Sequence, residues 1–266
     1  TSMDLVRYQQ FISLPYGLAL VCGPTGSGKS TTLYSTLRYL SSKEKNITTV
    51  EDPIEMVYED FNQIAVQPAA GITFSNILRN ILRQDPDILM IGELRDFETA
   101  QNAIQAALTG HLVLSTLHTN DASLAITRMI DIGIPRFLIH ATLTGVLAQR
   151  LLRKICPHCM EIFEISANDL MAMGIETKKT GVIELKRGSG CIRCRGTGYL
   201  GRVGIFEVLP VIESTKDLIL QESSADIIRQ AACKEGMITL RENAVKKMLD
   251  GKTTYQEVIR VTWEEV

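Results

Sequence analysis

The stretch Gly23-Pro24-Thr25-Gly26-Ser27-Gly28-Lys29-Ser30 decides how this 266-residue chain is interpreted. It matches the pattern G-x-x-x-x-G-K-[ST] without a gap and stands between the apolar run Leu18–Cys22 and a helical pattern, the context of a phosphate-binding loop. Its glycines let backbone N–H groups point at phosphate oxygens, and the helix N-terminus adds a favourable partial charge. We expect Lys29 to reach the β- and γ-phosphates of ATP and Ser30 to bind Mg²⁺. A purely structural glycine-rich turn is the alternative. The expected nucleotide contacts are Gly23, Pro24, Thr25, Gly26, Ser27, Gly28, Lys29, Ser30 and Thr31.

Strand and helix patterns alternate on either side of this loop. Continuous apolar or β-branched runs predict strands that are buried on both faces of a parallel sheet, at 18–22, 47–50, 88–91 and 112–114. Leu33, Leu37 and Leu40 share one face of a helix, and a second helical pattern precedes Asp85. Pro135 suits the first position of a long helix that would run toward Leu152. The fold class predicted is therefore α/β, a doubly wound P-loop core.

Composition changes twice along the chain and divides it into three stretches. Residues 1–155 carry the strand–helix alternation, residues 156–204 are rich in glycine and hold two C-x-x-C pairs, and residues 205–266 are again helical. The net charge of −2 argues against broad binding to a nucleic-acid backbone, so no nucleic acid is expected as a partner. No apolar run approaches the ~18 residues of a membrane-spanning helix, and we expect a cytoplasmic protein.

Acidic and histidine residues follow the predicted strands, at the sheet edge where ligands collect in α/β proteins. Glu51 and Glu55 follow the run 47–50, Glu93 follows 88–91, and His118 follows 112–114. A carboxylate beside a nucleoside triphosphate can hold Mg²⁺ or orient the attacking water. Glu93 is the first choice for this role, with Glu51 and Glu55 as alternatives, and His118 could sense the γ-phosphate.

Four cysteines form two C-x-x-C knuckles. They are Cys156, Cys159, Cys191 and Cys194. Four thiolates with no open position form the usual structural Zn²⁺ site, which adds to folding free energy rather than to catalysis. Free thiols are the alternative. We expect one Zn²⁺, with the surrounding glycines allowing the backbone to wrap tightly.

Four of these stretches together resemble the secretion ATPase superfamily, the ATPases of type II secretion and type IV pilus assembly. They are GPTGSGKST, ITTVEDPIE, ILMIGELRD and TGHLVLSTLHTNDA, beginning at residues 23, 47, 88 and 109. The resemblance includes Gly92, which stands where other P-loop enzymes carry an aspartate. It implies a RecA-like core, a tetracysteine subdomain and C-terminal helices. It also implies that arginines bind nucleotide phosphate across subunit boundaries, at Arg79, Arg83, Arg95, Arg128 and Arg202. Arg79 and Arg83 are four residues apart and are expected on one helix face.

By the same resemblance, the chain would be the carboxyl-terminal ATPase part of a longer protein. It would work as a homo-hexamer at the cytoplasmic face of a bacterial inner membrane, where an upstream region docks on secretion or pilus platform proteins. Pilus-retraction members lack the tetracysteine element, so the cysteines favour assembly or secretion. Two other functions remain open from the residues. One is a nucleic-acid translocase, which nucleic-acid-stimulated ATPase activity would reveal, and the other is a zinc-stabilised binding module.

Overall fold

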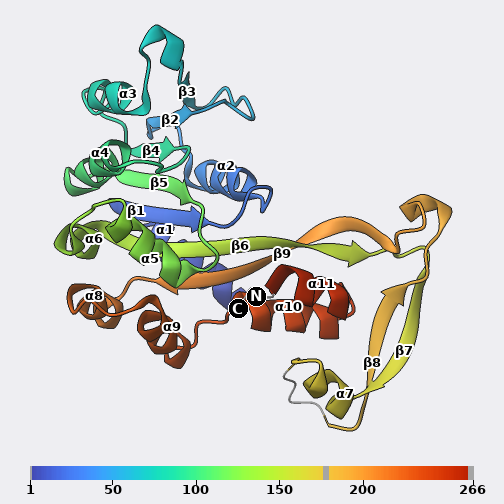
Figure 1. The fold of residues 1–266 in the computed structure, drawn as a ribbon. Helices are drawn as coiled ribbons and strands as arrows, with labels where there is room; N and C mark the ends of the chain where they lie inside the picture. Colours follow the sequence, from blue (N-terminus) through green and yellow to red (C-terminus); the bar gives the residue numbers. More distant parts are fainter. Residues whose placement is uncertain (1, 176–179, 263–266) are drawn as a thin grey trace. The chain divides into compact units, whose positions relative to one another are not determined.

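A computed structural model describes residues 2–175 and 180–262 of the chain. Its main feature is a seven-stranded sheet in the order β3-β2-β4-β5-β1-β6-β9 (Figure 1). The strands are β1 (Gly17–Cys22), β2 (Ile47–Glu51), β3 (Asn62–Ala65), β4 (Ile88–Ile91), β5 (Leu112–Leu117), β6 (Leu143–Ile155) and β9 (Tyr199–Pro210). Neighbouring strands from β3 to β6 pair in parallel. Every residue of β1, β2, β4 and β5 is buried, as their continuous apolar runs predict.

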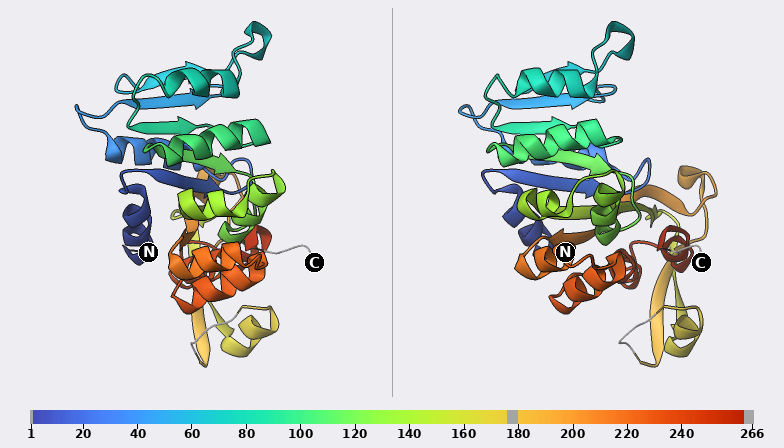
Figure 2. Two further views of the ribbon diagram at one scale, coloured as in Figure 1. Left: turned by 90° about the vertical axis from the view of Figure 1, so that its left-hand side faces the viewer. Right: turned by 60° about the vertical axis from the view of Figure 1, so that its left-hand side comes forward.

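Helices cover both faces of this sheet. Helices α3 (Phe74–Ile81) and α4 (Phe97–Leu108) lie on one face, and α2 (Lys29–Leu40) lies on the other (Figures 1 and 2). Leu33, Leu37 and Leu40 of α2 are buried, which confirms the helix face expected from their spacing. Other α-helices whose residues pack with this sheet region are α1 (Ser2–Ile12), α5 (Ala122–Asp131), α6 (Arg136–Thr142), α8 (Glu213–Leu220) and α9 (Ala225–Lys234). The predicted α/β class is confirmed.

The chain divides into two compact units, residues 1–149 with 207–237 and residues 150–206 with 238–266. The second unit holds the antiparallel pair β7 (Met160–Ser166) and β8 (Val182–Gly188), with α7 (Ala167–Ala172), α10 (Leu240–Leu249) and α11 (Tyr255–Thr262). These units group the residues differently from the three consecutive stretches of the sequence. Two of the three boundaries fall inside β6 and β9, so each of these long strands has residues in both units, and the third falls between α9 and α10.

The long helix expected from Pro135 toward Leu152 is wrong. Pro135 is the N-cap of α6, which ends at Thr142, and the chain continues as β6. The residues from Leu143 to Ala148 pair with β1, from Leu18 to Cys22. An apolar run that is buried on both sides fits a strand as well as a helix, and pairing with a neighbouring strand decided between them.

Strand β5 is also longer than its apolar run indicates. Ser115 and Thr116 continue it, fully or almost fully buried. Their hydroxyl groups donate to the carbonyls of Ile91, the last residue of β4, and of Gly92, which follows it, each at 2.7 Å. Because these polar side chains find backbone acceptors on the neighbouring strand, they lie inside the sheet without an unsatisfied group.

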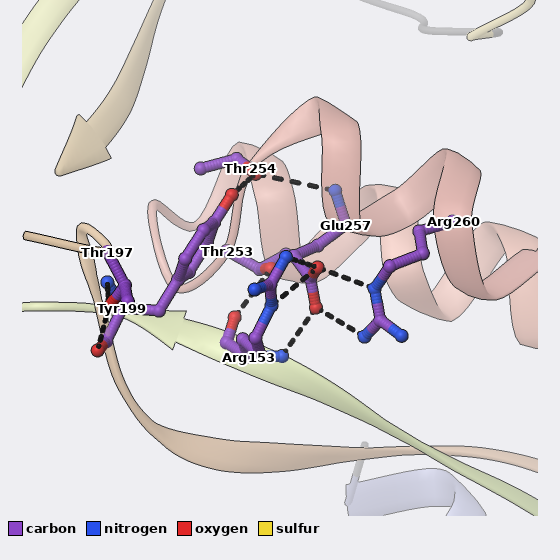
Figure 3. Close-up of polar contacts among 7 residues, drawn as sticks. All are labelled: Arg153, Thr197, Tyr199, Thr253, Thr254, Glu257 and Arg260. Atoms are coloured by element: carbon purple, nitrogen blue, oxygen red, sulfur yellow. Dashed lines mark hydrogen bonds and ion pairs between the residues drawn. The ribbon is translucent and has the colours of Figure 1, made fainter.

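A buried carboxylate ties α11 to β6 within the second unit (Figure 3). The Glu257 side chain is fully buried and accepts hydrogen bonds from the backbone N–H and guanidinium of Arg153 and from the guanidinium of Arg260, at 2.6–2.8 Å. The Arg153 guanidinium also lies 4.3 Å from the ring centroid of Tyr199, whose hydroxyl is 2.6 Å from that of Thr254. Burial alone would raise the pKa of Glu257, but the hydrogen bonds from Arg260 and Arg153 outweigh it and lower that pKa to about 2.

Candidate nucleotide site and tetracysteine cluster

The loop between β1 and α2 has the conformation that its glycines allow. Gly28 is the N-cap of α2 with φ of 90°, and Gly23 has φ of 149°. A Cβ atom on Gly23 would collide with the carbonyl oxygen of Gln149 on β6, so only glycine fits this close approach. The loop therefore leads directly from the carboxyl end of β1 into the N-terminus of α2.

Lys29 lies in the first turn of α2 and folds over the loop. Its ammonium group donates to the carbonyls of Gly23 at 2.8 Å and Pro24 at 3.1 Å. Burial lowers the pKa of Lys29, while Cys22 and the carboxylates of Glu93 and Glu55 act in the opposite direction. The structure thus brings Glu93 and Glu55 within electrostatic range of this lysine.

Glu93 follows β4 and is the centre of a small charged cluster. One carboxylate oxygen forms an ion pair with Arg95, and the other lies 3.5 Å from Nε2 of His118. The side chain of Glu93 is 14% exposed, whereas those of Arg95 and His118 are 65% and 51% exposed. The hydrogen bond to Glu93 raises the pKa of Arg95. Residues from two sequence stretches thus meet, and a carboxylate, a guanidinium and an imidazole can act there on one ligand.

Glu51 and Glu55 have different surroundings. Glu51 is buried, and its carboxylate accepts hydrogen bonds from the hydroxyls of Tyr34 and Thr49, the latter at 2.6 Å, and from the Gln63 amide at 3.2 Å. Burial and the contact with Glu51 raise the pKa of Tyr34. Glu55 is exposed in the loop after β2. The carboxylate of Glu51 is therefore occupied by its own buried network, and that of Glu55 is open to solvent.

A cavity of about 330 Å³ opens beside Glu93 and Arg95. Glu98, in the first turn of α4, also lines it and accepts hydrogen bonds from Arg79 at 2.6 Å and from Ser75 at 2.5 Å. Arg79 is thereby paired with a cavity-lining residue that the sequence patterns did not indicate. The lining residues are Asp52, Val66, Thr73, Phe74, Ser75, Glu93, Arg95, Asp96, Glu98 and Thr99.

The other arginines are more scattered. Helix α3 ends at Ile81, so the expectation that Arg83 shares a helix face with Arg79 is wrong. The chain leaves the helix here because Pro86 follows Asp85, which has a positive φ of 46°. Arg83 is exposed in the turn, Arg128 is exposed in the last turn of α5, and Arg202 is exposed on β9 within the second unit.

The four cysteines of the two knuckles come together. Their sulfur atoms all lie within 4.8 Å of one another. Three of the Sγ–Sγ distances are 3.9 Å (Cys156–Cys191), 3.8 Å (Cys159–Cys194) and 3.7 Å (Cys191–Cys194). A tetrahedron with Zn–S bonds of about 2.3 Å has edges of about 3.8 Å, so this arrangement fits a Zn²⁺ ion.

Backbone groups support this cluster. The N–H groups of Cys191 and Gly198 donate to the Cys194 sulfur at 3.1 and 3.3 Å, which favours the thiolate. Gly188 and Gly198 pack backbone against backbone, and a Cβ on either would collide with the carbonyl of the other. This close approach agrees with the expectation that glycines let the chain wrap tightly.

Comparisons with known proteins now decide the family. The model of the family described as "Type II/IV secretion system protein" matches residues 1–260. The chain belongs to this family. It is 46% identical over 259 residues to the type IV pilus assembly ATPase PilB of Myxococcus xanthus, covering 97% of this chain and 46% of that protein. It is 48% identical over 258 residues to the type II secretion system ATPase E of Vibrio cholerae, covering 97% of this chain and 51% of that protein.

Solved structures agree with the fold. The pilus retraction motor PilT with bound ADP is 31% identical, with a TM-score of 0.70, and the match covers 97% of this chain and 64% of that one. The Legionella pneumophila ATPase DotB has a TM-score of 0.69 at 24% identity over 96% of this chain and 62% of its own, which supports the fold alone. The chain spans about half the length of the two curated relatives described above. Across residues 2–175 and 180–262, no helix combines the length and apolar character needed to span a membrane.

Proposed function

We propose that this chain is the ATP-hydrolysing part of a motor for type II pseudopilus or type IV pilus assembly. The observation that carries the proposal is a phosphate-binding loop between β1 and α2 with Lys29 in the first turn of α2 and with Glu93, which follows β4, within electrostatic range of that lysine. Curated relatives carry the word ATPase in their names and cover almost the whole of this chain.

The residues have separate tasks in this proposal. The loop N–H groups bind the phosphates of ATP, Lys29 stabilises charge on the β- and γ-phosphates, and Ser30 binds Mg²⁺. A magnesium ion bound there neutralises phosphate charge during transfer. Glu93 accepts a proton from the attacking water, and for this it must exchange its ion pair with Arg95 for a hydrogen bond to that water. Arg95 and His118 would then be available to the γ-phosphate.

The tetracysteine cluster supports assembly or secretion rather than retraction, because the family resemblance implies that retraction members lack this element. The chain is 31% identical to a retraction motor, whereas its curated assembly and secretion relatives are 44–49% identical. Relatives from the type II and the type IV systems have similar sequence identity to this chain, 48% and 46%. The proposal therefore covers assembly of both kinds of filament. A homo-hexamer at the cytoplasmic face of the inner membrane, docked on platform proteins, completes the proposed working state.

Two substitutions test the activity. Lys29→Ala should abolish ATP turnover without unfolding the chain, because it removes a charge from the developing phosphate charge and touches no core packing. Glu93→Gln should keep nucleotide binding and lose turnover, because only proton handling changes. Phosphate release and binding of a fluorescent ATP analogue measure the two effects. Turnover by Glu93→Gln at the wild-type rate would remove Glu93 from the proposed role.

A further inference from the structure

Gln149 contacts the phosphate loop at Gly23 and Ser27 and the first turn of α2 at Thr32, although it lies far from them in sequence. Its side chain is on β6 and is 4% exposed. The amide nitrogen Nε2 donates to the carbonyl of Ser27 at 2.8 Å, and Oε1 accepts from the hydroxyl of Thr32 at 2.5 Å. Its backbone carbonyl lies against Gly23, at the position where a Cβ atom would collide. Gly23, Ser27 and Thr32 therefore all contact this one residue.

The bond to Ser27 sets the direction of a phosphate-binding group. In a planar trans peptide the C=O and N–H bonds point in opposite directions. Because the Ser27 carbonyl points at Gln149, the N–H of Gly28 must point away from β6. N–H groups of this loop are the ones that bind phosphate oxygens. The amide of Gln149 thus fixes the orientation of the peptide between Ser27 and Gly28.

The bond to Thr32 fixes the orientation of the amide itself. The Thr32 hydroxyl donates to Oε1, so the nitrogen end of the amide faces Ser27 and supplies the donor that a carbonyl requires. Leu, Met or Glu would fill a similar volume at this position, but none of them can donate to the Ser27 carbonyl. Glutamine is therefore suited here by its two-sided hydrogen bonding rather than by its size.

We propose that Gln149 is a positioning residue of the nucleotide site, which holds the phosphate loop in its binding conformation from a neighbouring strand. This inference rests on the proposed function, since it assumes that the loop binds ATP. It adds a residue outside the four sequence stretches to the machinery of that site.

The experiment compares nucleotide affinity and thermal stability in matched variants. Gln149→Leu should weaken both ATP and ADP binding by about ten-fold, because the Ser27 carbonyl loses its buried donor and the Gly28 N–H loses its fixed direction. Gln149→Glu keeps the shape and the bond from Thr32, but it sets an acceptor against the Ser27 carbonyl, so it should weaken binding at least as much. Thr32→Val should have a smaller effect, because the bond to Ser27 remains.

The control is Thr144→Val on the same strand. The Thr144 hydroxyl donates to the Leu18 carbonyl at 3.0 Å and does not contact the loop, so its loss should lower the melting temperature and leave affinity unchanged. Wild-type affinity in folded Gln149→Leu or Gln149→Glu would overturn the inference. A wild-type chain that binds no ATP would instead overturn the proposed function itself.

Discussion

Three carboxylates follow strand ends in this sheet, and their surroundings separate their roles. Glu93 is close to His118 and Arg95, Glu55 is exposed near Lys29, and Glu51 is buried among hydroxyl and amide donors. A carboxylate that already accepts hydrogen bonds from three side chains has little capacity left for a water molecule. We therefore expect a catalytic role only for a carboxylate with free acceptor capacity, and a structural role for Glu51.

We predict that replacing Glu51 acts on stability and replacing Glu55 acts on turnover. Glu51→Ala should lower the free energy of unfolding by about 2–3 kcal/mol, because it leaves the buried donors of Thr49 and Tyr34 without their acceptor. Glu55→Gln should leave unfolding unchanged and reduce ATP turnover, because it removes a charge near Lys29. Urea unfolding and steady-state ATPase assays measure the pair. A stable Glu51→Ala variant with lost turnover would reverse the assignment.

The site was predictable from sequence where its residues are contiguous. The loop from Gly23 to Ser30 and the stretch around Glu93 could be identified because their spacing alone implies their chemistry. Gln149 could not be identified, because it is 122 residues from Ser27 and lies in an apolar run that resembled a helix. Glu98 was missed for a related reason, since an acidic residue in the first turn of a helix is ordinary.

At the scale of elements, the strands that are continuous apolar runs were predicted, whereas the short edge strand β3 and the long strand β6 were not. The strands β1, β2 and β4 are short apolar runs between clear turns, and the runs predicted their positions closely. Strand β6 follows a seven-residue helix without a glycine or proline between them, so no local signal marks the change at Leu143. Pairing with β1, more than a hundred residues earlier, and with β9, which follows later in the chain, determines it.

The tetracysteine cluster predicts one Zn²⁺ per chain and a stability that depends on it. Cys191→Ser should lower the melting temperature, because losing a thiolate ligand removes metal-linked folding free energy. A chelator should lower the melting temperature of the wild type and change that of the variant little. Metal analysis with calorimetry measures both, and nucleotide affinity should stay unchanged as the control. Absence of zinc, with the four thiols of the cluster reactive in the native protein, would remove the site.

The lowered pKa of Glu257 predicts how the unfolding free energy of the second unit changes in acid. Its pKa is about 2 in the folded state and about 4.5 in the unfolded state, so its contribution to stability is complete above about pH 4.5 and is lost as pH falls toward 2. Glu257→Gln should destabilise the chain at neutral pH and should flatten the fall in unfolding free energy across that window. Asp217→Asn, an exposed change on α8, is the control. Equal slopes in the wild type and Glu257→Gln would contradict this account.

At the scale of the whole molecule, the first unit holds the phosphate loop and Glu93, and the second holds the cysteines and Arg202. The exposed arginines Arg83, Arg128 and Arg202 are therefore distributed over both units. An arginine that serves a neighbouring subunit must be exposed on its own chain, because it has to reach a phosphate elsewhere. Their exposure is consistent with the inter-subunit role that the family resemblance implies.

This arrangement predicts that the isolated chain binds ATP well and hydrolyses it slowly until subunits assemble. An arginine supplied in trans accelerates P-loop enzymes by about 10³ to 10⁵, so a subunit without its neighbour should lack most of that factor. Turnover per subunit should rise with protein concentration, in step with an increase in mass by light scattering. Arg202→Ala should reduce the rate of the assembled form and change the dilute rate little, whereas Lys29→Ala should abolish both. A fast rate that stays constant while the chain remains monomeric would mean that one chain contains the complete site.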